Sequence, residues 1–296
     1  MLIIAAVCIA GAAHAAPPEP TLRDVSYGPN KSDLLDFWKA DSKKPTPLVI
    51  FIHGGGFIQG SKRGASSEDI RKCLAGGISF ISVEYPFYNE LPLHEIIRNH
   101  IARAVQFARY KASEWNIDKK RVVVYGESAG AGSSLWLAYH DDIADPANAD
   151  PVLRESTRVT AAGAEATQAT YDFAQWAEVL SRVFDKKMVK TWYMIMMPMA
   201  LDMYHMKSDK ELKTPEAEAM RRDLDMLAMM DKNDPPVILE TYASTRRGGD
   251  PLHTEGHPIA VKDQCDKIGL SCILMLDSTP QEQRVKIIDF LIEHLK

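Results

Sequence analysis

The chain has 296 residues, of which 46% are hydrophobic, and this is enough to bury one large core in a single domain of catalytic size. Aspartate and glutamate outnumber lysine and arginine, 40 to 35, which gives a formal net charge of −5, and no basic stripe with interleaved aromatic residues offsets this charge. The composition therefore excludes a disordered or collagen-like chain and argues against nucleic acid as a partner.

The first residues differ in composition from the rest. Residues 2–13 form a short apolar run that ends in small residues, and Pro17 and Pro18 follow shortly after it. Such a run is too short to span a bilayer as a helix and is typical of a signal peptide, although no lysine or arginine precedes it. We expect a signal peptide at residues 1–16, a secreted or periplasmic location and no stable membrane insertion. The alternative is a buried N-terminal segment of the domain.

Alternating and continuous apolar runs predict a sheet. Apolar and polar residues alternate at 24–27 and 34–38, which favours two half-exposed strands joined by a turn. Residues 47–52 have no polar face, as expected of a strand covered on both sides. Further strands are predicted at residues 78–85, 122–125, 159–162, 237–242 and 271–275.

Helical patterns separate these runs. The apolar spacing within residues 92–115 predicts a helical crossover between parallel strands, and residues 281–295 read as a closing amphipathic helix. Between residues 171 and 234 the pattern is helical and very rich in methionine, with eleven of the thirteen methionines lying between Met188 and Met230. We expect one domain at residues 17–296 with a helical cap at about 171–234. Its methionines either pack the cap itself or line an adaptable apolar pocket.

Residues 126–130 read Gly-Glu-Ser-Ala-Gly directly after a predicted buried strand and before a helical stretch. This order is typical of a nucleophile elbow, in which two glycines allow a tight turn that exposes the serine oxygen. The N-terminus of the following helix favours negative charge that develops beside it. Ser128 is therefore the candidate nucleophile.

Residues 53–56 read His-Gly-Gly-Gly at the end of an earlier predicted strand. A carbonyl group attacked by Ser128 becomes an oxyanion, which requires preorganised N–H donors. The candidate donors are Ala129 from the elbow and Gly55 and Gly56 from the glycine run, where missing side chains let the backbone approach a substrate. The alternative for the glycine run is a flexible turn.

On these two motifs the chain resembles the α/β-hydrolase esterases of the hormone-sensitive-lipase and feruloyl-esterase-like groups, which share the HGGG loop and the GxSxG elbow. Matching segments are residues 53–62 (HGGGFIQGSK) and 112–132 (ASEWNIDKKRVVVYGESAGAG). The resemblance implies an α/β-hydrolase fold, with a mostly parallel central sheet and helices on both faces. It also implies hydrolysis of carboxylic esters through an acyl-enzyme, without a cofactor.

In that family an aspartate follows the seventh strand and a histidine follows the eighth. Asp250 follows the strand predicted at 237–242 and is the candidate carboxylate, with a plain turn aspartate as the alternative. After the strand predicted at 271–275 no histidine occurs before His294, which lies in the last helical turn. A serine without a base is a weak nucleophile, so this absence bears directly on activity.

His253 and His257 lie close to Asp250 in sequence, and either could supply the base. The loop that carries them is expected at the carboxyl edge of the sheet, where Ser128 also lies. We prefer His257 slightly, because it stands just before Pro258 and a predicted helix, whose dipole would keep the imidazole neutral. The alternative is that both are loop or packing histidines.

A metal site at this loop is disfavoured. Glycine and proline at positions 256 and 258 argue against the helical i, i+4 geometry that paired histidine ligands use, and the sequence is not a zinc-hydrolase signature. Cys73, Cys265 and Cys272 lack metal spacing and read as buried thiols, with a Cys265–Cys272 bridge as the alternative. We therefore expect no metal, and the resemblance to the esterases implies no cofactor.

Two functions are consistent with these motifs. The first is a serine carboxylesterase that acts on small or short-chain acyl esters and has a small-molecule ester as its partner. The second is a hydrolase-like binding protein that has lost catalysis together with the histidine after the eighth strand. The intact elbow and glycine loop favour the enzyme, because catalysis requires them and simple binding does not. The sequence does not indicate an oligomeric state.

Overall fold

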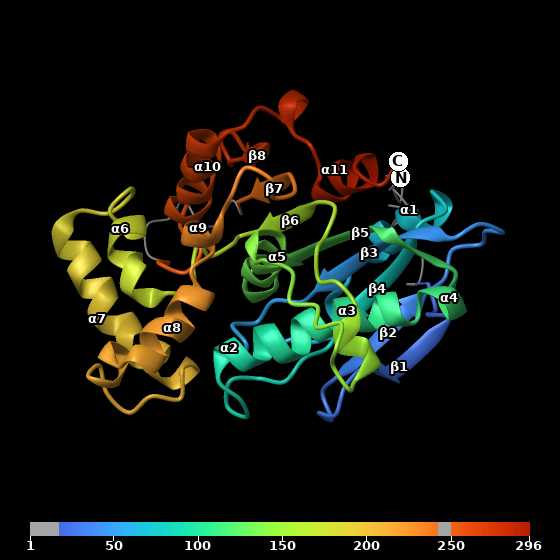
Figure 1. Ribbon diagram of the computed structural model, residues 1–296. Helices are drawn as coiled ribbons and strands as arrows, with labels where there is room; N and C mark the ends of the chain where they lie inside the picture. Colours follow the sequence, from blue (N-terminus) through green and yellow to red (C-terminus); the bar gives the residue numbers. More distant parts are fainter. Residues whose placement is uncertain (1–17, 242–249) are drawn as a thin grey trace, which may run out of the picture.

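The computed structural model describes residues 18–241 and 250–296, so the predicted signal peptide lies outside the described residues (Figure 1). Within these residues one sheet of eight strands has the order β1-β2-β4-β3-β5-β6-β7-β8. The strands are β1 (Leu22–Ser26), β2 (Leu34–Trp38), β3 (Thr46–Ile52), β4 (Ser79–Val83), β5 (Ile117–Glu127), β6 (Ala162–Glu165), β7 (Val237–Glu240) and β8 (Cys272–Met275). Only the pairs β1–β2 and β2–β4 are antiparallel, which confirms the predicted fold class.

Helices cover both faces of this sheet. The helices of the described residues, including those of the cap, are α1 (Ser67–Ala75), α2 (Leu93–Glu95), α3 (Ala102–Tyr110), α4 (Ala112–Trp115), α5 (Ala129–Tyr139), α6 (Trp176–Leu180), α7 (Lys186–Met203), α8 (Pro215–Asp223), α9 (Met226–Met229), α10 (Gly256–Ile268) and α11 (Ile287–Glu293). A π-helical turn joins α2 to α3. The predicted crossover therefore forms as several helical pieces in sequence.

The central strand β3 shows why the sheet has two cores. Its side chains alternate: Leu48, Ile50 and Ile52 belong to the large core that includes α3, α5 and α10, whereas Val49 and Phe51 belong to the smaller core under α1 and α11. All seven residues of the strand are buried. A strand covered on both faces has no polar side, and this accounts for the continuous apolar run in the sequence.

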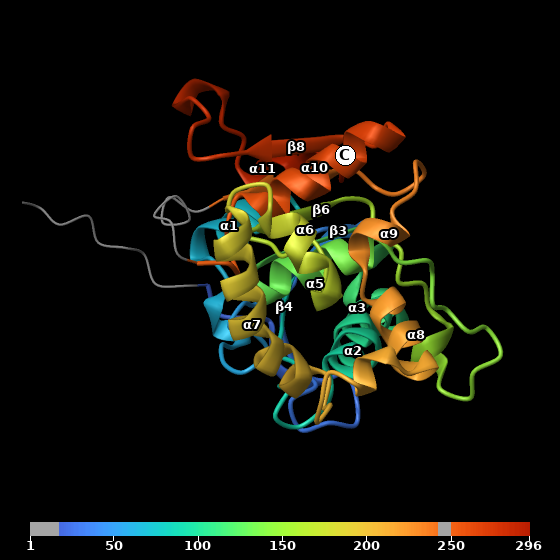
Figure 2. The same cartoon turned by 90° about the vertical axis from the view of Figure 1, so that its left-hand side faces the viewer.

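The helices α6 to α9 lie between β6 and β7 in the sequence, in the segment predicted as a cap. Figure 1 shows α6, α7 and α8 beside the sheet domain, and Figure 2 shows α7 crossing in front of the strands when that side faces the viewer. The methionines of the segment divide in two: Met203 and Met226 are buried, whereas Met194 is 59% exposed. Part of the methionine run therefore packs inward, and part of it faces solvent.

Several predicted elements differ from the observed ones, and β5, for example, begins at Ile117, before the strand expected at 122–125. The strand expected at 159–162 lies instead at Ala162–Glu165. The small side chains of Ala162 and Ala164 are fully buried there, and α5 packs against this strand. The closing helix expected at 281–295 is shorter, because a 3-10 turn at Gln281–Gln283 precedes α11. The small residues of β6 thus allow close packing, and the strand forms there rather than at the preceding segment that contains Val159.

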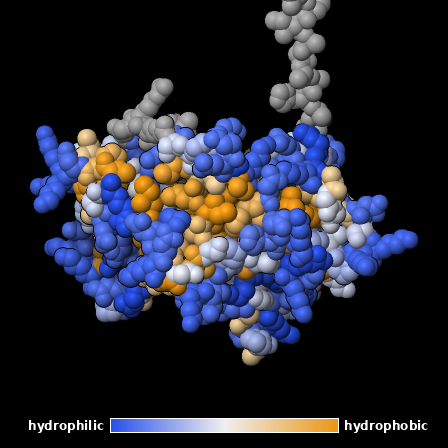
Figure 3. All heavy atoms as spheres, turned by 90° about the horizontal axis from the view of Figure 1, so that it is seen from above, coloured by the Kyte–Doolittle hydropathy of each residue, from blue (hydrophilic) through white to orange (hydrophobic). Residues whose placement is uncertain are grey.

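The strand β8 lies at one edge of the sheet and is only partly buried over its first three residues. Seen from the side of β8 and α10, apolar side chains gather in a band across the middle of the face, with hydrophilic side chains around it (Figure 3). Over residues 18–241 and 250–296, no helix combines the length and the apolar character needed to cross a membrane.

Candidate active site

Ser128 lies in the tight turn between β5 and α5, with a φ of +50° and a ψ of −114°. A Cβ atom built on Gly126 would lie 2.4 Å from the carbonyl carbon of Gly130, and one built on Gly130 would lie 1.9 Å from the carbonyl oxygen of Ile52. Both contacts are with backbone, which cannot move aside as a side chain can. The two glycines of the motif are therefore required by the approach of the first turn of α5 to the ends of β3 and β5.

The Ser128 hydroxyl is not used to cap α5, although Ser128 is the N-cap residue of that helix. Its backbone N–H donates to the carbonyl of Glu165 at 2.8 Å, and this bond fixes the turn to the end of β6. The Oγ atom lies 2.8 Å from Nε2 of His253. The turn thus leaves the hydroxyl available to one partner, a loop histidine.

His253 stands between Ser128 and Asp250. Its Nδ1 atom lies 2.6 Å from Oδ2 of Asp250, and Oδ1 of the same carboxylate accepts the N–H of Leu252 at 2.9 Å. The carboxylate can only accept at neutral pH, so Nδ1 carries the proton and Nε2 is free to accept the Ser128 hydroxyl. The three side chains form one hydrogen-bonded chain of the type that activates a serine.

His257 occupies a different place from the one its sequence position suggested. Its side chain is fully buried, Nε2 donates to the carbonyl of Pro251 at 2.9 Å, and Nδ1 accepts the N–H of Ala169 at 3.2 Å. Both ring nitrogens are thus engaged with backbone, and the structure brings His253 rather than His257 to Ser128. The slight preference for His257 as the base disagrees with this geometry, because α10 begins at Gly256 and turns His257 into the core.

The loop that carries Asp250 and His253 is held at two points. His257 binds the carbonyl of Pro251, and the carboxamide of Gln168 donates to the carbonyl of Leu252 at 2.9 Å. Sequence reasoning missed Gln168, because nothing in its local pattern distinguishes it from an ordinary loop residue. Its position shortly after β6, at the carboxyl edge of the sheet, is the signal that could have indicated it.

The glycine loop packs directly against the elbow. A Cβ on Gly54 would lie 2.8 Å from the carbonyl oxygen of Glu127, and Gly55 and Gly56 have φ values of +112° and +61°. Gly56 and Ala129 line the same cavity as Ser128, whereas Gly55 does not line it. The carbonyl of Gly55 accepts two backbone N–H groups and closes the turn. Of the predicted oxyanion donors, Gly56 and Ala129 are therefore the ones beside Ser128.

His53, the first residue of this loop, holds the loop in place. Its Nδ1 lies 2.7 Å from the carbonyl oxygen of Gly54, its Nε2 lies 2.9 Å from Oε1 of Glu84, and its ring stacks on Tyr85 with centroids 4.2 Å apart. The Tyr85 hydroxyl donates to the carbonyl of His53 at 2.7 Å. Glu84 and Tyr85, at the end of β4, thus position the loop, and the sequence motif alone did not reveal them.

Three glutamates stand side by side where β5, β6 and β7 end. Glu127 pairs across the sheet with Glu165, and Glu165 with Glu240. Burial, followed by the charges of Glu240 and Glu127, raises the pKa of Glu165 to about 7. A guanidinium offsets part of this charge, because Arg284 binds Glu240 at 2.8 Å. The Glu165 side chain therefore holds a proton below neutral pH. Its backbone carbonyl separately accepts the N–H of Ser128.

The cavity at Ser128 is small, with a volume of about 50 Å³. Its other walls are mostly aromatic and apolar and come largely from the cap and the loops beside it. The lining residues are Gly56, Phe57, Ser128, Ala129, Gln168, Tyr171, Phe173, Trp176, Met199, Met203 and Leu252. An oxyanion that forms here is surrounded by low-dielectric material, which strengthens each hydrogen bond to it.

Within the two described stretches of the chain, no group of three or more His, Cys, Asp or Glu side chains is arranged to hold a metal ion. Cys73, Cys265 and Cys272 are free thiols there.

His294 lies at the end of α11, where Nδ1 contacts the carbonyl of Phe290 at 2.8 Å. The chemistry that the arrangement supports is nucleophilic attack by an activated serine.

The family model named BD-FAE matches residues 35–239, a stretch that contains both motifs and the cap and extends from β2 into β7. The chain belongs to the BD-FAE family.

Other proteins resemble this BD-FAE member over part or all of its length. It is 29% identical over 112 residues to Esterase LipC of Mycobacterium tuberculosis (36% of this chain, 27% of that protein) and 46% identical over 126 residues to Endo-1,4-beta-xylanase B of Butyrivibrio fibrisolvens (41% and 19%). The chain spans between 4% and 27% of the length of the curated relatives it matches. A solved structure titled as a truncated form of carbohydrate esterase from gut microbiota superposes on this chain with a TM-score of 0.70 at 16% identity. The superposition covers 93% of this chain and 95% of that one, so the two share a fold.

Replacing Gly130 by alanine tests the packing of the elbow. Because the new Cβ would meet the carbonyl of Ile52, we expect Gly130→Ala to lower the free energy of unfolding by more than about 2 kcal/mol. Gly64→Ala is the matched control, since its nearest atom would be 3.9 Å away, and it should change stability by less than about 0.5 kcal/mol. Urea unfolding followed by circular dichroism measures both; equal effects would contradict the tight contact.

His257 should make the folded protein sensitive to acid. Burial lowers the pKa of His257 to about 4 from its ordinary value of 6.5, so the unfolded chain takes up a proton at a higher pH than the folded chain does. Stability from this group is complete above pH 6.5 and falls as the pH drops towards 4. We expect the loss to be about 3 kcal/mol larger in the wild type than in His257→Gln between pH 7 and pH 4. Parallel pH profiles of unfolding would show that His257 is not held neutral.

Proposed function

We propose that the protein is a serine carboxylic ester hydrolase that works through an acyl-enzyme. The observation that carries this proposal is the hydrogen-bonded chain from Ser128 Oγ to His253 to Asp250, at 2.8 and 2.6 Å, in the same cavity as Gly56 and Ala129. The BD-FAE family and the relative named as an esterase support the same reaction.

In the proposed reaction the Ser128 oxygen attacks the ester carbonyl carbon while His253 Nε2 takes the hydroxyl proton. The carbonyl oxygen becomes negative and accepts N–H groups of the glycine loop and of Ala129, at the N-terminus of α5. His253 then gives the proton to the leaving alcohol, and Asp250 stabilises the imidazolium in between. Water attacks the acyl-enzyme by the same route, which releases the carboxylic acid and restores Ser128.

We propose a small acyl group, such as acetyl, for the part of the substrate bound beside Ser128. The cavity has a volume of about 50 Å³, and the rings of Phe57, Phe173 and Trp176 line it, which leaves little space beside Ser128. A longer chain would have to displace side chains of the cap, which costs packing energy. The size of the cavity thus favours small or short-chain acyl esters.

For the alcohol part of the substrate we propose a carbohydrate. The support comes from two similar proteins, since one is named as a xylanase and the other is titled as a carbohydrate esterase. We also propose that the protein acts outside the cytoplasm after removal of residues 1–16, because the apolar run at 2–13 is typical of an export signal. Acylated polysaccharides that remain outside the cell would then be accessible to it.

The alternative, a binding protein that lacks a base, rested on the absence of a histidine after the eighth strand. His253 removes the reason for that alternative, because it supplies a base from the preceding loop within hydrogen-bonding distance of Ser128. The carboxylate needed to orient this base comes from the same loop. The geometry therefore favours the enzyme.

The catalytic roles are tested by comparing the wild type with Ser128→Ala, His253→Ala and His257→Gln. We expect kcat on p-nitrophenyl acetate to fall by about 10⁴-fold or more in the first two variants, with little change in thermal stability, because each removes one part of a single proton-transfer unit. His257→Gln should retain measurable turnover. Full activity of His253→Ala, or equal losses in both histidine variants with both still folded, would contradict the assignment of the base.

The size of the acyl cavity predicts the chain-length preference. We expect the wild type to have a kcat/KM for p-nitrophenyl acetate at least about tenfold above that for the hexanoate, because one excess methylene in an apolar pocket can already change rates by about tenfold or more. Met203→Ala should reduce this ratio, since Met203 lines the cavity and is 4% exposed. Met194→Ala, at a methionine that is 59% exposed, is the control and should leave the ratio unchanged. A wild type that prefers hexanoate would contradict the small cavity.

A further inference from the structure

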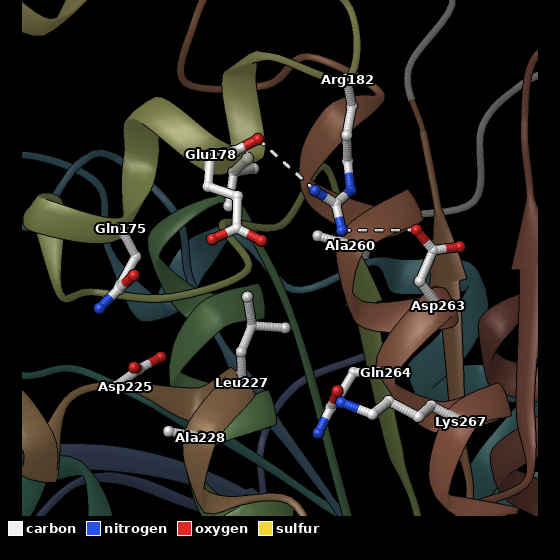
Figure 4. Close-up of a pocket in the computed structure, with 11 residues that line it drawn as sticks. Gln175, Glu178, Arg182, Asp225, Leu227, Ala228, Ala260, Asp263, Gln264 and Lys267 are labelled. Carbon is white, nitrogen blue, oxygen red and sulfur yellow. Dashed lines mark hydrogen bonds and ion pairs between the residues drawn. The ribbon is translucent and has the colours of Figure 1, made fainter.

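A second pocket, of about 440 Å³, lies between the cap and α10 (Figure 4). It is separated from the Ser128 cavity by α6, since Trp176 at the start of that helix lines the small cavity, whereas Glu178 and Val179 line the larger pocket. Its volume is within the range of roughly 300–1,000 Å³ that is typical of small-ligand sites. The residues that line it are Gln175, Glu178, Val179, Arg182, Asp225, Leu227, Ala228, Ala260, Asp263, Gln264 and Lys267.

The walls of this pocket carry planar polar side chains from several segments of the chain. Figure 4 shows Gln175 and Glu178 on the cap side, Asp225 below them and Gln264 opposite on α10. Carboxylates and carboxamides each present two polar atoms in one plane, so a single side chain can bind two neighbouring hydroxyl groups. The short apolar side chains of the pocket, such as that of Leu227, can cover the C–H face of a sugar ring.

The charges of the pocket nearly balance. Three carboxylates accompany one guanidinium and one ammonium, and Arg182, which follows α6, pairs with Asp263 of α10 at 3.4 Å. A phosphate would meet the carboxylates, and a divalent cation would meet Arg182 and Lys267, so neither kind of ion is favoured. A neutral ligand with many hydroxyl groups suits this mixture of donors and acceptors best.

Part of this polar lining has no protein partner. Asp225 is 9% exposed and is fixed by the hydroxyl of Thr170, which donates to Oδ1 at 3.0 Å. In contrast, over residues 18–241 and 250–296 the carboxamides of Gln175 and Gln264 make no hydrogen bond to another protein group, and Figure 4 shows both at the pocket. Gln175 is exposed and Gln264 is partly buried, so both carboxamides face solvent and can bind a ligand without breaking an internal hydrogen bond.

We propose that this pocket is a binding site for a neutral saccharide unit, distinct from the site of ester cleavage. The choice of a saccharide rests on the proposed function, in which the alcohol part of the substrate is a carbohydrate. The pocket would hold an unacylated part of a polysaccharide chain while the Ser128 cavity takes the acyl group of another part.

The pocket is lined both by the cap and by the helix that follows the loop of the proposed base. One wall is α6 of the cap, and the other is α10, which begins at Gly256 shortly after His253. A saccharide that binds both walls would hold the cap against the helix that follows the loop of the proposed base.

The test is isothermal titration calorimetry of the full chain with xylotetraose, which carries no acyl group and therefore cannot be cleaved as an ester, so binding alone is measured. We expect saturable binding to the wild type. The double variant Gln175→Leu/Gln264→Leu should weaken it at least about tenfold, which corresponds to about 1.4 kcal/mol. Gln283→Leu, at an exposed glutamine of the turn before α11, is the matched control and should bind as the wild type does.

Turnover of p-nitrophenyl acetate separates this proposal from the proposed function. The double variant should retain wild-type turnover, since neither glutamine lines the Ser128 cavity, and retained turnover also shows that it is folded. If the wild type shows no saturable binding, or if the double variant binds as tightly as the wild type does, the saccharide site is wrong, whatever the esterase activity. A wild type that binds xylotetraose in this pocket but cleaves no ester would contradict the proposed function alone.

Discussion

The contact between the first turn of α5 and the end of β3 is the constraint on which the rest of the site depends. Gly130 approaches the carbonyl of Ile52 so closely that no side chain fits between them. Because the chain continues from Ile52 into the glycine loop, and because Gly54 in turn packs on the carbonyl of Glu127, the serine and its oxyanion donors belong to one packed unit. Neither part can shift without the other, which is the preorganisation that stabilisation of an oxyanion requires.

The proposed acid–base pair depends on a weaker support. Asp250 and His253 lie in one short loop rather than after two different strands, so their mutual distance is set locally, whereas their distance from Ser128 is set by whatever holds the loop. That support is the pair of bonds from Gln168 and His257 to consecutive carbonyls. The arrangement leaves β8, a partly exposed edge strand, without a role in the site. The histidine that the family likeness placed after this strand is therefore not required.

The sequence predicted the parts of the site that depend on local pattern. Ser128 and the glycine loop follow buried strands directly, and steric demands in a tight turn can be inferred from two glycines. The identity of the base could not be predicted, because His253 and His257 differ only in which side of the start of α10 they occupy. A single turn of helix directs His257 into the core, and the boundary of a helix is uncertain from sequence by several residues. Gln168 and Glu84 were missed for a related reason, since their contacts join segments that are far apart in the chain.

The cap links these local features to the choice of substrate. Its α6 helix has two sides of opposite chemistry, with Trp176 in a small apolar cavity and Glu178 in a larger polar pocket. Ester cleavage is favoured in the apolar cavity, because exclusion of water strengthens the hydrogen bonds to an oxyanion. A polyhydroxylated chain binds favourably only where polar side chains replace the hydrogen bonds that its hydroxyl groups make to water. The indole of Trp176 donates to the carbonyl of Thr170 at 2.9 Å, and the hydroxyl of the same Thr170 binds Asp225 of the polar pocket. The two environments are therefore connected through Thr170, whose carbonyl holds the wall of the acyl cavity and whose hydroxyl holds a carboxylate of the polar pocket.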